Sequence, residues 1–283
     1  MTGSASEARE AAGVAPYRLL CINLERSTDR REAMSARADA LGLTVEFIPA
    51  TLGAALDLET GPPGYQRRRR ALTWTGPLTA AEHGCLASHR AALKAFLAGP
   101  ETCAVVLEDD ARPLPEFDAT VKRLMALGEA AAAVRLLTYL RDDPGRAAHE
   151  WPDGQGLVLR RKWTLGGAAT FYTRAGAAAL LARTEAYFEA WDNLLGRPWI
   201  AGAPILELRR SIAELADVES TIEPGRAEAR RGRATGAARL RPEKRERTWW
   251  RMATGAHRKL TGSGALRRHR RQLKAAVLRA DLD

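Results

Sequence analysis

Apolar residues along the chain fall into short continuous runs, separated by longer stretches in which they recur at helical spacing. The run "YRLLCINLE", Tyr17–Glu25, is bounded by polar residues, which predicts a buried strand. Residues 27–41 have helical spacing and end at Gly42, a residue that commonly follows a helix. "TVEFIPA", residues 44–50, alternates like a second strand. A β-α-β unit of this length typically opens an α/β fold.

The same alternation of strands and helices continues to about residue 208 and predicts a mixed, mostly parallel sheet flanked by helices. Residues 51–78, which include the run Arg67–Arg70, are irregular and contain Gly and Pro, and residues 141–156 are polar, so both are predicted loops. The other predicted strands are residues 103–110, 133–140, 156–163, 166–173 and 198–208, and the other predicted helices are 78–99, 115–127 and 174–188.

The helix predicted over residues 78–99 carries a histidine whose role is open. Thr79 and Glu82 have the spacing of a capping box at its start. Leu86, His89 and Leu93 lie on one apolar face. A histidine in that position is usually a hydrogen-bonded core residue, so His89 is either part of the core or part of a site.

Charge divides the chain into two parts. Residues 226–283 contain eighteen Lys and Arg against five Asp and Glu, a balance of +13, so that residues 1–225 carry −3 of the total +10. We therefore expect a globular domain over residues 17–225 and a basic C-terminal segment, helical or partly disordered, over 226–283. Residues 1–16 are expected to form a disordered tail.

Targeting signals and cysteine spacing favour a reduced, cytoplasmic protein. No apolar run approaches the roughly 18 residues that a membrane span needs, and the N-terminus lacks the basic start and apolar core of a signal peptide. Cys21, Cys85 and Cys103 are widely separated, and no Cys-x-x-Cys pair occurs. This pattern argues against a disulfide framework or a zinc site and predicts three reduced core residues.

Three consecutive carboxylates, Glu108, Asp109 and Asp110, end the apolar run that begins at Cys103. In open α/β sheets the ligand crevice lies at the carboxyl ends of the strands. Alternation along a strand predicts Glu108 and Asp110 on one side and Asp109 on the other. Clustered carboxylates raise one another's pKa unless a cation neutralises them, and Mg²⁺ or Mn²⁺ would do so while accepting substrate phosphates. The plainer interpretation is a solvated strand end with a helix-capping Asp.

Five segments occur in an order that resembles glycosyltransferase family 25, the bacterial lipooligosaccharide sugar transferases related to collagen galactosyltransferases. The segments are "INLERSTDRREAM", "LTAAEHGCLASHRAAL", "VVLEDDARP", "GGAATFYTRAGAAALL" and "WDNLL". The resemblance covers about residues 17–225. It implies a GT-A-type α/β fold, a UDP-sugar donor such as UDP-galactose or UDP-glucose, a divalent metal, and transfer with inversion at the anomeric carbon.

The resemblance also implies residues that bind the donor. Asn23, Arg26 and Arg30 follow the first strand, where the nucleotide would lie and where Arg could bind phosphate bidentately. Ser88 and His89 would hydrogen-bond the donor or orient an acid. The plainer interpretation of Arg30 is a solvated charge on a helix.

Further roles follow for the acidic triplet and the later segments. Glu108 and Asp110 would bind the metal, Asp110 having a catalytic role as well, and Asp109 would assist in binding the diphosphate. Asp192 is the candidate base that takes the proton of the acceptor hydroxyl, although it could equally be a helix N-cap. Gly167 would allow the backbone to approach the sugar closely, although it could equally belong to a plain turn.

The basic C-terminal segment has its own predicted partner. Trp249 and Trp250 lie among clustered Arg residues, a pattern typical of a peripheral helix on an anionic membrane. The second interpretation is nucleic-acid binding, although no recognition motif supports it. The third is a disordered tail without a partner.

The sequence therefore predicts a metal-dependent inverting glycosyltransferase. It would move galactose or glucose from a UDP-sugar to a hydroxyl of a lipooligosaccharide or another cell-surface glycan, in the cytoplasm or on the inner face of the membrane. The alternatives are a catalytically degenerate relative that binds only nucleotide or membrane, and another metal-dependent nucleotide enzyme such as a nucleotidyltransferase or phosphohydrolase.

Overall fold

The structure is a computed structural model. It describes residues 17–59, 61–73, 77–138, 146–159, 166–196 and 205–216. The predicted N-terminal tail and basic C-terminal segment lie outside these residues, so the domain boundaries stay predictions.

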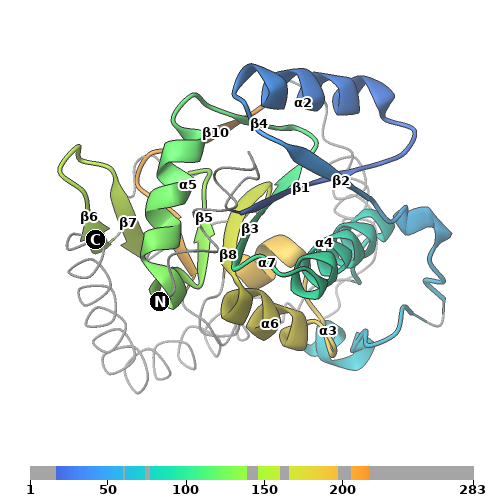
Figure 1. Cartoon of the computed structure of the whole chain (residues 1–283). Helices are drawn as coiled ribbons and strands as arrows, with labels where there is room; N and C mark the ends of the chain where they lie inside the picture. Colours follow the sequence, from blue (N-terminus) through green and yellow to red (C-terminus); the bar gives the residue numbers. More distant parts are fainter. Residues whose placement is uncertain are drawn as a thin grey trace.

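An eight-stranded sheet forms the centre of the described chain, in the order β2-β1-β3-β8-β5-β9-β7-β6 (Figure 1). The pairings place six strands in one direction and oppose β7 and β8 to them. The predicted α/β class with a mixed, mostly parallel sheet is therefore confirmed. The strands are β1 (Arg18–Asn23), β2 (Val45–Pro49), β3 (Cys103–Glu108), β5 (Ala133–Arg135), β6 (Arg146–Glu150), β7 (Gly156–Leu159), β8 (Ala169–Thr173) and β9 (Ile205–Leu208).

Helices cover both faces of this sheet. Buried residues of α2 and α5 share one hydrophobic cluster, and those of α4, α6 and α7 share another. Figure 1 shows the same division, with α4, α6 and α7 gathered apart from α2 and α5. The helices are α2 (Thr28–Ala40), α3 (Arg67–Thr73), α4 (Ala80–Ala98), α5 (Phe117–Ala126), α6 (Arg174–Arg183) and α7 (Trp191–Leu195), with short 3₁₀ turns η1 (Gly53–Ala55) and η2 (Gly128–Ala131).

Strand β3 shows why its sequence is apolar without interruption. Val105 and Leu107 pack in the cluster with α2 and α5, whereas Ala104 and Val106 pack in the cluster with α4. Because successive side chains point to opposite faces and both faces are covered, every position in the strand interior must be apolar. The run ends at Glu108, where the strand reaches the edge of the core.

The structure corrects the two predicted loops. The run Arg67–Arg70 belongs to helix α3, because arginine is a good helix former even without an apolar stripe. Residues 146–150 form β6, a short edge strand that pairs only with β7 within the described sheet. A polar edge strand lacks the apolar alternation by which strands are recognised, and its charge protects the edge from further pairing.

A small second sheet was not predicted. Strand β4 (Ala111–Pro113) pairs antiparallel with β10 (Ala213–Leu215), and the amide of Ala216 donates to the carbonyl of Asp110 at 2.7 Å. Three-residue strands are too short to leave a periodic signal. This sheet fixes the turn that follows the acidic triplet.

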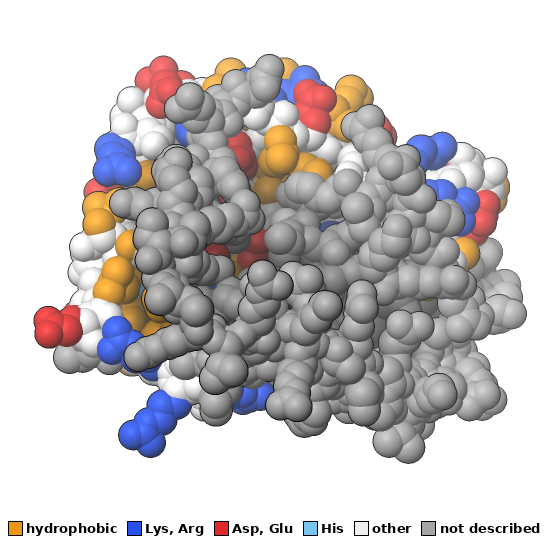
Figure 2. All heavy atoms as spheres, turned by 180° about the vertical axis from the view of Figure 1, so that it is seen from behind, with side chains coloured by type: hydrophobic (Ala, Val, Ile, Leu, Met, Phe, Trp, Pro, Cys, Tyr) orange, Lys and Arg blue, Asp and Glu red, His pale blue; other side chains and the backbone are white. Residues whose placement is uncertain are grey.

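Among the described helices, none combines the length and the apolarity that crossing a bilayer would require. On the face shown in Figure 2, Lys and Arg side chains of the described residues are visible at several places around the outline. The charge count assigns the excess of Lys and Arg to residues 226–283.

Candidate functional site

A cavity of about 270 Å³ lies at the carboxyl ends of the parallel strands β1 and β3. This is the position at which open α/β sheets bind their ligands. One part of its lining is charged or polar and contains Arg26, Arg30, His89, Glu108 and Asp109. Another part is apolar and comes from the segment around η1 and the first turn of α4. The pocket therefore offers cations and anions beside a nonpolar wall.

Two glycines allow this wall to form. A Cβ on Gly84 would lie 2.6 Å from the carbonyl oxygen of Thr51 and 2.8 Å from the amide nitrogen of Gly53. A Cβ on Gly53 would in turn collide with the backbone of Ala80. Only residues without side chains permit η1 to rest directly on α4 at this point.

Hydrogen bonds of Ser88 stabilise the same contact between the η1 segment and α4. Its hydroxyl donates to the carbonyl of Gly84 at 2.7 Å and accepts from the amide of Thr51 at 2.8 Å. The side chain is buried, although it also lines the pocket. Ser88 was predicted to bind the donor, and the structure shows that its hydroxyl holds the wall in place.

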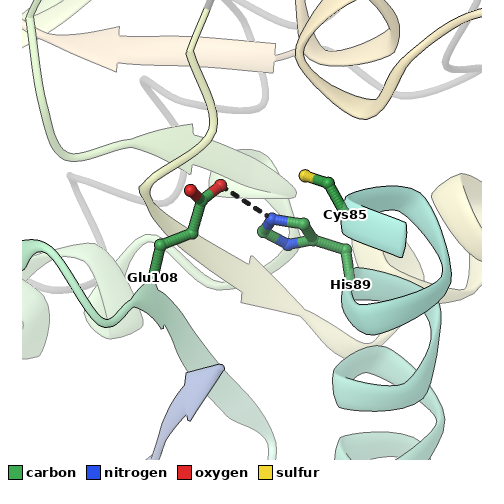
Figure 3. Close-up of side chains that lie close together, drawn as sticks. All are labelled: Cys85, His89 and Glu108. Atoms are coloured by element: carbon green, nitrogen blue, oxygen red, sulfur yellow. Dashed lines mark hydrogen bonds and ion pairs between the residues drawn. The ribbon is translucent and has the colours of Figure 1, made fainter. Parts of the chain in front are cut away.

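His89 and Glu108 meet on the floor of the pocket (Figure 3). His89 Nε2 lies 3.1 Å from Glu108 Oε1, so a neutral ring protonated on Nε2 donates a hydrogen bond to the carboxylate. The His89 ring stacks on Trp191 of α7, with 4.7 Å between centroids and 12° between planes. His89 was expected to be either a core residue or a site residue. In the structure it is buried and also lines the pocket.

Asp109 is held by the residues that follow β1. Its Oδ1 accepts from Arg30 at 3.0 Å, and its Oδ2 accepts from the Asn23 amide at 2.8 Å. Arg30 and Asp109 are largely shielded from solvent, which strengthens their attraction. Asn23 does not line the pocket, so it orients Asp109 and is not itself a pocket residue.

Asp110 occupies a different environment. Burial, reinforced by the charges of Glu108 and Asp109, raises the pKa of Asp110 to about 6. Its Oδ1 is buried and accepts no hydrogen bond from the described residues. The triplet leaves the strand after Glu108, so alternation does not continue, and the pocket brings Glu108 together with Asp109 instead of Asp110.

The other predicted site residues lie beside the pocket. Gly167 faces α7, since a Cβ there would come within 3.0 Å of the side chains of Trp191 and Leu195. Asp192 lies in the first turn of α7, whose N-cap is Ala190, and accepts from the amide of Asn193 at 2.8 Å. Neither Gly167 nor Asp192 lines the pocket.

Cys85 is a pocket residue with a metal-binding side chain that the sequence interpretation missed. Cys21 and Cys103 are buried as predicted, but Cys85 is only partly buried and lines the pocket; none of the three forms a disulfide. Its Sγ and one ligand atom each of His89 and Glu108 lie within 4.8 Å of one another. The four-residue spacing between Cys85 and His89, which places both on one face of a helix, was the available signal.

Comparison with known proteins agrees with this arrangement. Residues 18–151, which contain all the pocket residues, match the sequence model of "Glycosyltransferase family 25 (LPS biosynthesis protein)". Proteins named "Glycosyltransferase 25 family member" are 31% identical in Anopheles gambiae and 32% in Aedes aegypti, each over 155 residues, and 30% in Drosophila melanogaster over 161 residues.

These alignments cover 51%, 51% and 53% of this chain and 26%, 25% and 25% of the respective relatives. The chain thus spans about a quarter of the length of the curated relatives it matches. The family-matched residues 18–151 hold the strands, the helix and the acidic triplet that build the pocket. Residues 18–151 of this chain are therefore similar to glycosyltransferase family 25.

Proposed function

We propose that this protein is a glycosyltransferase that moves a hexose, galactose or glucose, from a UDP-sugar to a hydroxyl of a lipooligosaccharide or another cell-surface glycan. The observation that carries the proposal is the pocket in the family-matched segment, where Arg26 and Arg30 line the same cavity as Glu108 and Asp109 at the carboxyl ends of β1 and β3. Such a pocket suits a ligand with a charged diphosphate and a base whose flat ring face can pack on an apolar wall.

The donor would use both sides of the pocket. Arg26 is exposed and Arg30 partly buried, and both guanidinium groups can bind phosphate oxygens, Arg30 while it also holds Asp109. The apolar wall around Leu52 and Ala81 offers a surface for the base. Leu52 is 41% exposed where it lines the pocket.

A divalent cation fits this proposal through Glu108. Both oxygens of Asp109 already accept hydrogen bonds, and Asp110 does not line the pocket. Mg²⁺ or Mn²⁺ is commonly bound by one or two carboxylates together with substrate phosphates. When bound, such an ion would offset the charge that develops on the departing UDP.

Inversion by direct displacement needs a base. The acceptor oxygen forms the new bond to the anomeric carbon, the bond to the diphosphate breaks, and a carboxylate takes the hydroxyl proton. Asp192 remains our candidate for that carboxylate. Its neighbour Trp191 stacks on His89, so α7 lies against the floor of the pocket.

Donor binding and transfer are tested on the full chain. UDP with Mn²⁺ is expected to raise the melting temperature, because a ligand that binds only the folded state stabilises it. Arg26→Gln should reduce this shift, whereas Arg31→Gln, at an exposed position outside the pocket, should not. Mass spectrometry should then detect a hexose added to a glycan acceptor.

Three other outcomes would count against the proposal. Absence of any nucleotide shift contradicts the donor site. A shift without transfer to any glycan acceptor favours a degenerate binding protein. Release of phosphate without sugar transfer favours a phosphohydrolase.

We also propose that the protein works in the cytoplasm at the inner face of the membrane. The support is the basic segment 226–283, which carries Trp249 and Trp250 and suits an anionic surface with a lipid-linked acceptor.

A further inference from the structure

Two of three side chains that lie together in the pocket, the thiol of Cys85 and the imidazole of His89, differ chemically from the oxygen ligands that Mg²⁺ and Mn²⁺ prefer. Cys85 and His89 project from one face of α4, and Glu108 reaches them from the end of β3 (Figure 3). Their sulfur, nitrogen and oxygen atoms lie within 4.8 Å of one another. Thiolate and imidazole ligands select borderline cations such as Zn²⁺ and Co²⁺ over hard ones.

We propose that Cys85, His89 and Glu108 form a binding site for one borderline divalent cation, with Zn²⁺ as the expected ion. Zinc bonds of about 2.0 Å to nitrogen and oxygen and about 2.3 Å to sulfur place tetrahedral ligands roughly 3.3–3.6 Å apart. His89 Nε2 and Glu108 Oε1, 3.1 Å apart, are already near this spacing, so the main adjustment is an approach of Cys85 Sγ by about 1 Å, less than a change of side-chain rotamer provides. Cys85 and Glu108 are partly exposed, so their side chains have room to move.

Of the three proposed ligands, His89 is the least mobile and is already oriented in the structure. His89 is 1% exposed, and its ring is fixed between Trp191 and Glu108 with Nε2 directed at the carboxylate. A cation between Nε2 and Glu108 would replace their hydrogen bond, and the ring proton would then reside on Nδ1, a buried atom that has no hydrogen-bond partner among the described residues. A preset imidazole reduces the entropy lost on binding.

Charge and access also suit the ion. A thiolate, a carboxylate and a neutral imidazole balance a divalent cation. Binding releases the thiol proton to solvent, so the affinity should increase as the pH rises. All three residues line the pocket, which leaves a fourth position open to water or a ligand, as in zinc sites with three protein ligands.

Cobalt titration of the metal-stripped full chain tests this inference, because Zn²⁺ itself has no visible spectrum whereas a Co²⁺–thiolate bond absorbs in the near ultraviolet. We expect this absorption to saturate at one equivalent in the wild type. It should also do so in Cys103→Ser, a control whose thiol is buried in the opposite hydrophobic cluster. In Cys85→Ser the absorption should be lost, and in His89→Gln the affinity should fall by about tenfold or more.

Selectivity gives a second readout. Zn²⁺ should displace the cobalt at one equivalent, and a large excess of Mg²⁺ should not. An unchanged band in Cys85→Ser, or displacement by Mg²⁺ at similar concentrations, would overturn the site.

A chemical measurement covers the case in which Cys85→Ser does not fold. In the wild-type protein, Zn²⁺ should slow alkylation of Cys85 by iodoacetamide, measured by peptide mass spectrometry. An alkylation rate that Zn²⁺ leaves unchanged would equally overturn the proposal. Neither experiment needs a sugar donor, so each can fail while glycosyl transfer is observed, although Glu108 is also the carboxylate proposed above for Mg²⁺ or Mn²⁺ and the two ions would compete for it.

Discussion

Three adjacent carboxylates coexist because each has a different environment. Glu108 accepts a hydrogen bond from buried His89, and Asp109 is neutralised by Arg30 and oriented by Asn23. Asp110 is buried beside them and holds its proton more tightly. Their mutual repulsion is thus reduced by the protein itself, and a bound cation would add to this effect.

The stability of the protein should depend on the protonation of Asp110. Its pKa of about 6 in the folded state exceeds the ordinary value of 3.8, so the folded state takes up a proton between these values. Protonation favours folding there, and the contribution of Asp110 to the free energy of unfolding decreases as the pH rises towards 6. Above that pH the cost of the buried charge is fully present.

Asp110→Asn should consequently be more stable than the wild type at pH 7.5, with a smaller difference at pH 4.5. Urea denaturation in the presence of a chelator measures both. Asp39→Asn, at an exposed position of α2, serves as the control and should change the free energy of unfolding by less than about 0.5 kcal/mol. If Asp110→Asn is no more stable than the wild type at pH 7.5, the charge of Asp110 does not destabilise the folded state.

Asp192→Asn separates catalysis from binding. If Asp192 takes the acceptor proton, its loss should lower kcat by about 10²–10⁴-fold and leave the UDP-induced melting shift unchanged. Glu185→Gln, a nearby exposed carboxylate, should retain full activity. Turnover that survives in Asp192→Asn would assign the base to another residue.

At the scale of elements, the pocket depends on how closely η1 approaches α4. Gly84→Ala would place a methyl group against the backbone of Thr51 and Gly53, which no change of side-chain rotamer can relieve. We expect a loss of about 1–3 kcal/mol in the free energy of unfolding, together with weaker UDP binding as the wall shifts.

Urea denaturation and UDP titration measure the two effects of Gly84→Ala. Lys94→Ala, at an exposed position on the same helix, provides the comparison and should alter neither quantity appreciably. Normal stability and UDP affinity in Gly84→Ala would mean that the wall can move without consequence for the pocket.

The elements with strong periodicity were predictable, and the shorter ones were not. Helix α4 was expected with its capping box, which the structure confirms through hydrogen bonds between Thr79 and Glu82. Strand β3 was expected from its apolar run. By contrast, β4, β6 and β10 are formed by tertiary pairing of polar or very short segments, which leaves no local pattern.

The same limit applies to the site. Motif order identified Arg26, Arg30, Ser88, His89, Glu108 and Asp109, all of which line the pocket. Alternation failed at Asp110 because the strand ends one residue after Leu107, and no one-dimensional pattern shows where a turn redirects a side chain. Cys85 was missed because its partner Glu108 is distant in the sequence.

At the scale of the whole molecule, the chain combines a globular part of slightly negative charge with a strongly basic segment. We expect the full chain to bind vesicles that contain anionic lipid and to be released by salt, because polybasic attraction falls off within a Debye length.

Replacing Trp249 and Trp250 with Ala in the full chain should weaken this binding, since aromatic side chains insert at the membrane interface. Co-sedimentation with anionic and with neutral vesicles provides the measurement. Equal binding to both kinds of vesicle, or none to either, would contradict a role for the basic segment at the membrane.

The position of β8 in the sheet has a consequence for biosynthesis. One edge of β3 pairs with β1, which has already been made, but its other edge pairs with β8, which ends 65 residues later, at Thr173. At roughly 5–20 residues per second, the ribosome needs about 3–13 s to supply that partner. During this interval an entirely apolar strand interior has one open edge on the nascent chain. The time window for chaperone capture or for misassociation is therefore set by the order in which the strands are translated.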